Sequence, residues 1–170
     1  PTVTGLAPAS GPEAGGNTLT VSGSGFANFG PGANVLTFGG VAASAVSVQS
    51  DATLTCVVPA GPGGTRVDVQ LTNANGSDLL ALGYRYNPAP TLAGLAPASA
   101  SSLGGTQMTL TGTGFDDPSV TSTLVTFGGL AAFNLVVVSG TEIACELPAG
   151  PAGLAVDVLL VNDNGAAQLS

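Results

Sequence analysis

The second half of this sequence repeats the first at a fixed offset. The segment Gly5–Ser10 recurs letter for letter as Gly94–Ser99, a shift of 89 residues. At that offset 36 of the 81 aligned pairs are identical without a gap, and most shared positions are glycines, prolines or apolar residues. A period of 89 exceeds the roughly 20–50 residues of solenoid repeats, so each copy is long enough to close its own core. The sequence therefore predicts two domains, residues 1–88 and residues 89–170.

Each copy reads as a series of short β-strands. Runs of roughly four to eight residues alternate apolar with polar side chains between Gly, Pro, Asn or Asp, which is typical of strands with one buried face. No segment has a capped helical pattern. About seven such strands per copy predict an all-β, immunoglobulin-like sandwich. The rows expected to face inward contain Leu19, Val21, Leu36, Phe38, Val46, Val48, Leu54, Cys56, Val58, Val67, Val69, Leu71, Leu80, Leu82, Tyr84 and Tyr86, with Met108 and Leu110 in the second copy.

The junction between the copies is short and contains two prolines. It reads Tyr86-Asn87-Pro88-Ala89-Pro90, and proline favours an extended, semi-rigid path over a floppy tether. We therefore expect successive domains to be held end to end. The second copy reaches Ser170 before the residues that would match Tyr84 and Tyr86, so its last strand is expected to be incomplete.

The charge balance argues against several functions. The chain has two Arg, no Lys, no His and ten acidic residues, for a net charge of −8. Phosphate binding needs clustered Lys and Arg, so a nucleic acid partner is not expected. His, Lys and partnered Cys are the usual groups for proton transfer and nucleophilic attack, so we expect no enzyme, catalytic residue or cofactor. No apolar run approaches the roughly 20 residues that span a bilayer, so no membrane insertion is expected in this segment.

Three polar or glycine-rich motifs are candidate binding sites. Gly23–Gly25 lacks the third glycine and the following helix of a dinucleotide site, and it is interpreted as a turn or bulge. Asp116, Asp117 and the Asn162–Gly165 loop offer oxygens of the kind that Ca²⁺ prefers. Neither spacing supplies about six ligands, so no metal site is expected.

Two cysteines, one asparagine and two phenylalanines are the remaining candidates. Cys56 and Cys145 lie on inward rows about one domain apart, on the order of 30 Å, whereas a disulfide needs Cα atoms within about 7 Å. We predict two buried free thiols. Asn75 begins the only Asn-x-Ser/Thr sequence and is the candidate N-glycosylation site, in an accessible turn. Phe29 and Phe133, which have no aromatic counterpart in the other copy, are candidates for stacking on sugar rings.

Eight short elements follow one another in the first copy, and most recur in the second. They are Pro1–Pro8, Gly15–Gly16, Gly23–Phe26, Phe38–Gly40, Thr55–Pro59, Val67–Val69, Asn75–Gly76 and Tyr84–Tyr86. The order of these elements resembles the IPT/TIG family of immunoglobulin-like domains. The resemblance covers nearly the whole chain, although the second copy has Ala144 where the first has the threonine before its cysteine. It implies the early-set immunoglobulin-like sandwich, which occurs in receptor ectodomains, surface proteins, accessory modules of sugar-processing enzymes and some DNA-binding proteins.

These observations favour a non-enzymatic structural or adhesive module at the cell surface or in an extracellular fibre. A surface poor in Lys and rich in Thr, Ser and Gly is commoner outside cells, and its hydroxyls offer positions for O-linked sugar. The expected partners are neighbouring copies of the same module, joined end to end in a longer array, with covalent glycans as an open alternative. An accessory module of a larger secreted enzyme and a receptor ectodomain segment remain the other hypotheses.

Overall fold

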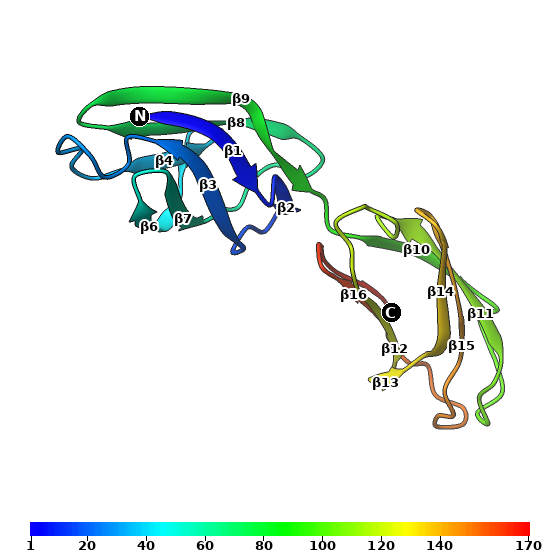
Figure 1. Ribbon diagram of the computed structural model, residues 1–170. Helices are drawn as coiled ribbons and strands as arrows, with labels where there is room; N and C mark the ends of the chain where they lie inside the picture. The colour runs from blue at the N-terminus through cyan, green and yellow to red at the C-terminus, as the bar shows by residue number, and fades with distance from the viewer. The chain divides into compact units, whose positions relative to one another are not determined.

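The computed structural model describes all 170 residues and contains β-strands but no helix. The chain forms two compact units, Pro1–Pro88 and Ala89–Ser170, which we call module 1 and module 2 (Figure 1). Each module has two β-sheets around one apolar core. Since there is no helix, none is long and apolar enough to cross a membrane.

Module 1 places nine strands in two sheets. One sheet has the order β1-β3-β7-β6, and the other has the order β2-β9-β8-β4-β5. All pairings are antiparallel except that of β2 with β9. The bounds are β1 (Thr2–Ala7), β2 (Ser10–Pro12), β3 (Thr18–Ser24), β4 (Val35–Phe38), β5 (Val41–Ala42), β6 (Ser44–Ser50), β7 (Thr53–Val57), β8 (Arg66–Asn73) and β9 (Gly76–Asn87).

Module 2 repeats this topology with one strand fewer. Its sheets have the orders β10-β11-β15-β14 and β13-β12-β16-β17. The counterpart of β2 is absent, and the last strand has five residues where β9 has twelve. The bounds are β10 (Thr91–Ala96), β11 (Gln107–Thr113), β12 (Thr123–Phe127), β13 (Leu130–Ala131), β14 (Phe133–Ser139), β15 (Glu142–Glu146), β16 (Val158–Asn162) and β17 (Gly165–Leu169).

The predicted alternation places the core correctly along most strands. On β3, Leu19 and Val21 have no exposed surface, and Met108 and Leu110 are buried at the same places on β11. Phe26 and Phe115, which follow the β3 and β11 strands, are also buried. The remaining buried apolar residues of module 1 are Val3, Leu36, Phe38, Leu54, Cys56, Val58, Val69, Leu71, Tyr84 and Tyr86.

Two residues predicted to face inward are exposed instead. Val48 on β6 is 41% exposed and Leu82 on β9 is 59% exposed. Both strands are bulged: β6 shifts register on either side of Val48, and three residues of β9 lie opposite Asp68 alone. Leu82 has φ 49°, and its N–H donates to the Asp68 carboxylate at 2.7 Å. A bulge interrupts the two-residue alternation of side chains along a strand, so a residue that the alternation places on the inner face can point to solvent instead.

Candidate functional site

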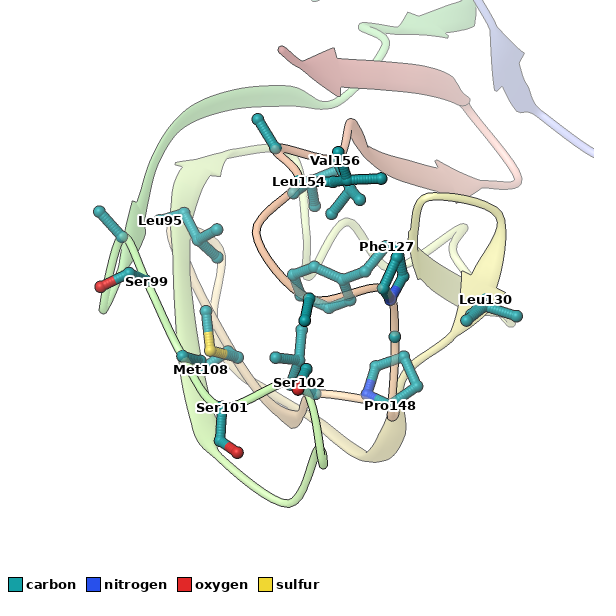
Figure 2. A pocket seen from close by; sticks show the side chains of 18 of the residues that line it. Leu95, Ser99, Ser101, Ser102, Met108, Phe127, Leu130, Pro148, Leu154 and Val156 are labelled. Atoms are coloured by element: carbon teal, nitrogen blue, oxygen red, sulfur yellow. The ribbon is translucent and has the colours of Figure 1, made fainter.

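One cavity of the chain lies in module 2, between the segment after β10 and the segment before β16. It has a volume of about 490 Å³ and is lined mostly by apolar side chains. Figure 2 shows Met108 and Phe127 on strands around the cavity, with Leu154 and Val156 on the segment before β16. The opposite rim carries serine hydroxyls from the segment after β10. No lining residue is ionisable, and cavities with mostly apolar linings are typical of ligand-binding sites.

The same place in module 1 is filled by two tyrosines of β9. Tyr84 and Tyr86 are 0% and 1% exposed, and their rings meet edge to face with centroids 5.1 Å apart. The Tyr86 hydroxyl donates to the Pro59 carbonyl at 2.8 Å. The Tyr84 hydroxyl exchanges hydrogen bonds with the Asn17 side-chain amide at 3.1 and 3.2 Å. Burial raises the pKa of Tyr84 and raises that of Tyr86 to about 12. The cavity of module 2 is thus the space that these rings occupy in module 1.

Sequence reasoning missed the cavity. The residues around Tyr84 and Tyr86 recur in the second copy, whereas the positions that match the two tyrosines lie beyond Ser170. Pro148 and Gly150, for example, match Pro59 and Gly61. That these residues form the wall of a cavity is visible only in the structure.

Cys56 and Cys145 are both free and buried, on β7 and β15. Burial raises the pKa of the Cys145 thiol and raises that of Cys56 to about 11. A thiolate is the reactive form of cysteine, and a raised pKa keeps the thiol protonated near neutral pH. Both side chains belong to the cores of their modules, where a thiol packs as a small apolar group.

We predict that a thiol reagent labels the native protein very slowly at pH 8 and labels two cysteines per chain after unfolding in denaturant. The reason is that the reagent reaches either sulfur only when its module opens. Labelling followed by intact mass, with and without denaturant, checks this. Rapid labelling of the native chain, or a covalent dimer that disappears on reduction, would show that a thiol is accessible.

Asn75 lies exposed in the turn between β8 and β9. Its backbone N–H donates to the Asn73 side chain at 3.0 Å, and its own side-chain amide is 3.4 Å from the Asn28 carbonyl. The turn therefore presents this side chain at the surface. Asn164 holds the equivalent position in module 2, but Ala166 stands where the acceptor sequence needs Ser or Thr. Asn75 stays a predicted glycosylation site.

Two of the acidic residues considered for Ca²⁺ accept hydrogen bonds from backbone N–H and hydroxyl groups, Asp163 from the segment just before β12 and Asp117 within its own loop. The Asp163 carboxylate accepts hydrogen bonds from the backbone N–H and hydroxyl groups of Thr121 and Ser122, and the Thr121 N–H contributes most to lowering the pKa of Asp163. Asp117 accepts from the N–H and hydroxyl of Ser119. The structure brings no three His, Cys, Asp or Glu side chains together in a metal-binding arrangement.

The remaining candidates are the glycine-rich segment at the end of β3 and the exposed aromatic side chains of Phe29 and Phe133. Gly23 lies in β3 against β1, where an added Cβ would approach the Thr2 carbonyl oxygen to 1.9 Å. Gly23 is therefore required for close strand approach, and Gly25, at φ 74°, makes the turn that follows. Phe29 is 92% exposed in a loop, and Phe133 is 59% exposed on β14. The two rings belong to different modules.

Comparison with known proteins gives one family. A model of the IPT/TIG domain matches residues 1–86 and, separately, residues 90–170. Mouse Fibrocystin-L is 37% identical over 87 residues, which cover 51% of this chain and 2% of that protein. Human Fibrocystin-L is 30% identical over 116 residues, which cover 65% of this chain and 3% of that protein. The chain thus spans only a few per cent of the length of these relatives.

Two solved structures of the plexin A4 full extracellular region share the fold. One matches with a TM-score of 0.54 at 24% identity, covering 99% of this chain and 17% of that one. The other matches with a TM-score of 0.51 at 20% identity, covering 95% and 14%. Together with the matched domain model and the sheet topology, these likenesses confirm the all-β, immunoglobulin-like sandwich predicted from the sequence.

Proposed function

The chain belongs to the IPT/TIG domain family, with one domain in residues 1–86 and a second in residues 90–170, and from that premise we propose that it is a non-enzymatic structural or adhesive module. In this proposal it is a unit of a longer tandem array that forms a cell-surface stalk or an extracellular fibre. Its partners are neighbouring copies joined end to end, and glycans decorate its hydroxyl-rich faces.

The pattern of identity between the two copies carries this proposal. Identical positions include the buried Phe26, Phe38 and Cys56, the turn glycines and the buried Asn73. The exposed loop of residues 27–34 differs from residues 116–123 at every position. What repeats is therefore mainly the set of residues that builds the sandwich, although the exposed residues Ala7–Ala9 also recur as Ala96–Ala98. This pattern is expected of a protein whose role is to extend an array of folded domains, because such a role requires each copy to keep the same fold.

The extracellular location has two supports. The chain has only two basic residues and no lysine, and Thr and Ser occupy many outward strand positions. The plexin A4 structures that share its fold are of an extracellular region. The same likeness favours a receptor ectodomain segment as the second candidate. The two candidates differ in what adjoins the modules, because a receptor continues into a membrane span and a fibre continues into further copies.

Antibody labelling of intact source cells tests the location. With an antibody raised against this chain, the signal on unpermeabilised cells should equal the signal after permeabilisation. An antibody against a cytosolic protein serves as the control and should label only permeabilised cells. A signal that appears only after permeabilisation would contradict an extracellular role for either candidate.

Asn75 gives a second test. When the chain is secreted from a eukaryotic host, we expect one N-linked glycan per chain, and Asn75→Gln should remove all N-linked mass. Ser77→Ala should do the same, because the acceptor sequence needs the hydroxyl residue. Intact mass before and after enzymatic removal of N-glycans is the measurement. An unglycosylated wild-type chain, or glycan retained by Asn75→Gln, would refute this assignment.

A further inference from the structure

Strand β14 of module 2 exposes large apolar side chains at positions where module 1 is polar. Phe133, Val136 and Val138 on β14 are 59%, 57% and 56% exposed. The residues at the same three positions of β6 are Ser44, Ser47 and Gln49. Apolar side chains that gather on one part of a surface are typical of an interaction site.

The neighbouring strand differs between the modules in the same way. In module 1 the Gln49 amide donates to the Ser47 hydroxyl at 3.1 Å and lies 3.4 Å from the Thr55 hydroxyl of β7. Module 2 has Ala144 in place of that threonine, paired with Val136. Three polar side chains that contact one another in module 1 are thus all apolar in module 2. We call the surface formed by Phe133, Val136, Val138 and Ala144 the β14 patch.

A carboxylate lies beside this patch. Glu146 of β15 is the cross-strand partner of Phe133, and the Cβ atoms of such a pair are about 4.5–5.5 Å apart on the same face of a sheet. The Glu146 carboxylate accepts a hydrogen bond from the Gln107 amide at 2.7 Å, and an ionised carboxylate has room for further donors. A surface that complements the β14 patch therefore has an apolar hollow beside a cation.

Module 1 has such a surface on the outer face of its β4–β8–β9 sheet. A hollow there is lined by Leu79 and Leu82, which are 53% and 59% exposed, and by the exposed Arg66. The Arg66 guanidinium is 3.4 Å from the Leu82 carbonyl oxygen, so the cation lies at the apolar rim. Asp68 also lines this hollow, where its carboxylate accepts from the Leu82 N–H at 2.7 Å. We call this surface the Arg66 hollow.

Each of these two surfaces occurs in one module only. Both arginines of the chain are in module 1, whereas module 2 has six carboxylates and no basic residue. Module 2 has Ala155 and Gln168 at the positions of Arg66 and Leu79, and module 1 has polar residues at the positions of the β14 patch. The complementary charges are therefore divided between the two modules.

We propose that the β14 patch of one chain docks into the Arg66 hollow of a second copy of this chain. Phe133 enters the hollow between the two leucines, and Glu146 pairs with Arg66. Because the contact joins unlike surfaces, each copy can bind one neighbour through each surface, and contacts of this kind build open-ended assemblies unless the rotation closes a ring. This inference rests on the proposed function, in which neighbouring copies are the partners, and it names the surfaces through which they meet.

The mass of the 170-residue chain in solution, measured by sedimentation over a range of concentrations, tests this contact. In about 0.15 M salt, which screens charges beyond about 8 Å, the wild-type mass should rise with concentration. Phe133→Ser and Arg66→Glu should each raise the dissociation constant at least about tenfold, because aromatic and Arg side chains are the usual hot spots of an interface. Phe29→Ser is the matched control and should change nothing, since Phe29 is 92% exposed but lies outside both surfaces.

A mixture of the two variants gives the sharpest result. Arg66→Glu keeps its β14 patch and Phe133→Ser keeps its Arg66 hollow. Equal amounts of the two should therefore form a dimer with one chain of each kind and no larger species. Arg66→Glu combined with Glu146→Arg in one chain should restore association, because the two charges are exchanged. Thermal unfolding of each variant confirms that it is folded.

Three results would overturn the proposal. If the wild-type chain is monomeric at every concentration, the β14 patch does not bind a second copy. If the mixture contains only monomers, or if Phe29→Ser weakens association as much as Phe133→Ser, these two surfaces do not meet. Each of these results would leave the proposed function standing, because an array can also join its modules within one polypeptide.

Discussion

Tyr84→Ala is expected to lower the free energy of unfolding of module 1 by about 3–5 kcal/mol, the range found when a large buried aromatic side chain is truncated. Tyr84 has no exposed surface and packs edge to face on Phe38, with ring centroids 5.2 Å apart. The substitution opens a cavity between the two sheets and leaves Asn17 without its hydroxyl partner. Because a small domain is stable by only about 5–15 kcal/mol, the loss is a large part of the total.

Tyrosine fluorescence during denaturation reports module 1 alone, because both tyrosines are in that module and the chain has no tryptophan. Tyr86 remains as the reporter in the variant. Leu82→Ala on the same strand is the matched control, and we expect it to change the free energy of unfolding by less than about 0.5 kcal/mol because Leu82 is exposed. Equal effects of the two substitutions would contradict the assignment of Tyr84 to the core.

Asn73→Ala is expected to destabilise module 1 by about 2–4 kcal/mol, since each buried polar group left without a partner costs about 1–3 kcal/mol. The Asn73 amide donates to the Gly25 carbonyl and to the Asn34 side chain, and its oxygen accepts from the Asn75 N–H, all at 3.0 Å. These bonds join the β8–β9 turn to the turn after β3. The substitution removes the hydrogen-bond partner of the Gly25 carbonyl and that of the Asn75 N–H at the same time.

Module 2 offers a replicate of this experiment. Asn162 is buried at the matching position and makes the equivalent bonds to the Gly114 carbonyl and the Asn164 N–H, both at 3.0 Å. Asn162→Ala should therefore destabilise module 2 by a similar amount, measured through the NMR signal of the Met108 methyl group, since Met108 is the only methionine of the chain. Gln70→Ala, on the exposed face of β8, is the control. If Asn73→Ala is no more destabilising than Gln70→Ala, these asparagines do not hold the turns.

Much of the fold was predictable because it depends on local patterns that the repeat shows twice. The alternation of apolar and polar residues predicted the buried rows of β3 and β8, and the glycines that are identical in the two copies indicated the turns. The exposure of Val48 and Leu82 was not predictable, because a bulge changes which face a residue takes without changing residue type. Asn73 and Asn162 could have been found as identical polar residues on otherwise apolar inward rows.

The cavity was beyond sequence reasoning for a different reason. Its lining comes from segments far apart in the sequence, among them residues 97–102 and 150–156, and whether they enclose a space is a matter of packing. Ala100, which lines the cavity where the first copy has Gly11, is an ordinary difference in the sequence. It acquires meaning only when the Tyr84 hydroxyl is located beside Gly11.

Electron microscopy of the native assembly, purified from its source without denaturation, tests the proposal that this chain is a unit of an end-to-end array. The proposal predicts filaments or stalks whose axial repeat equals one or two module lengths. Two-module densities of this fold should follow one another along the axis, and non-protein density should lie beside Ser, Thr or Asn75. Compact single particles, in which these modules adjoin a catalytic domain and repeat no further, would contradict it.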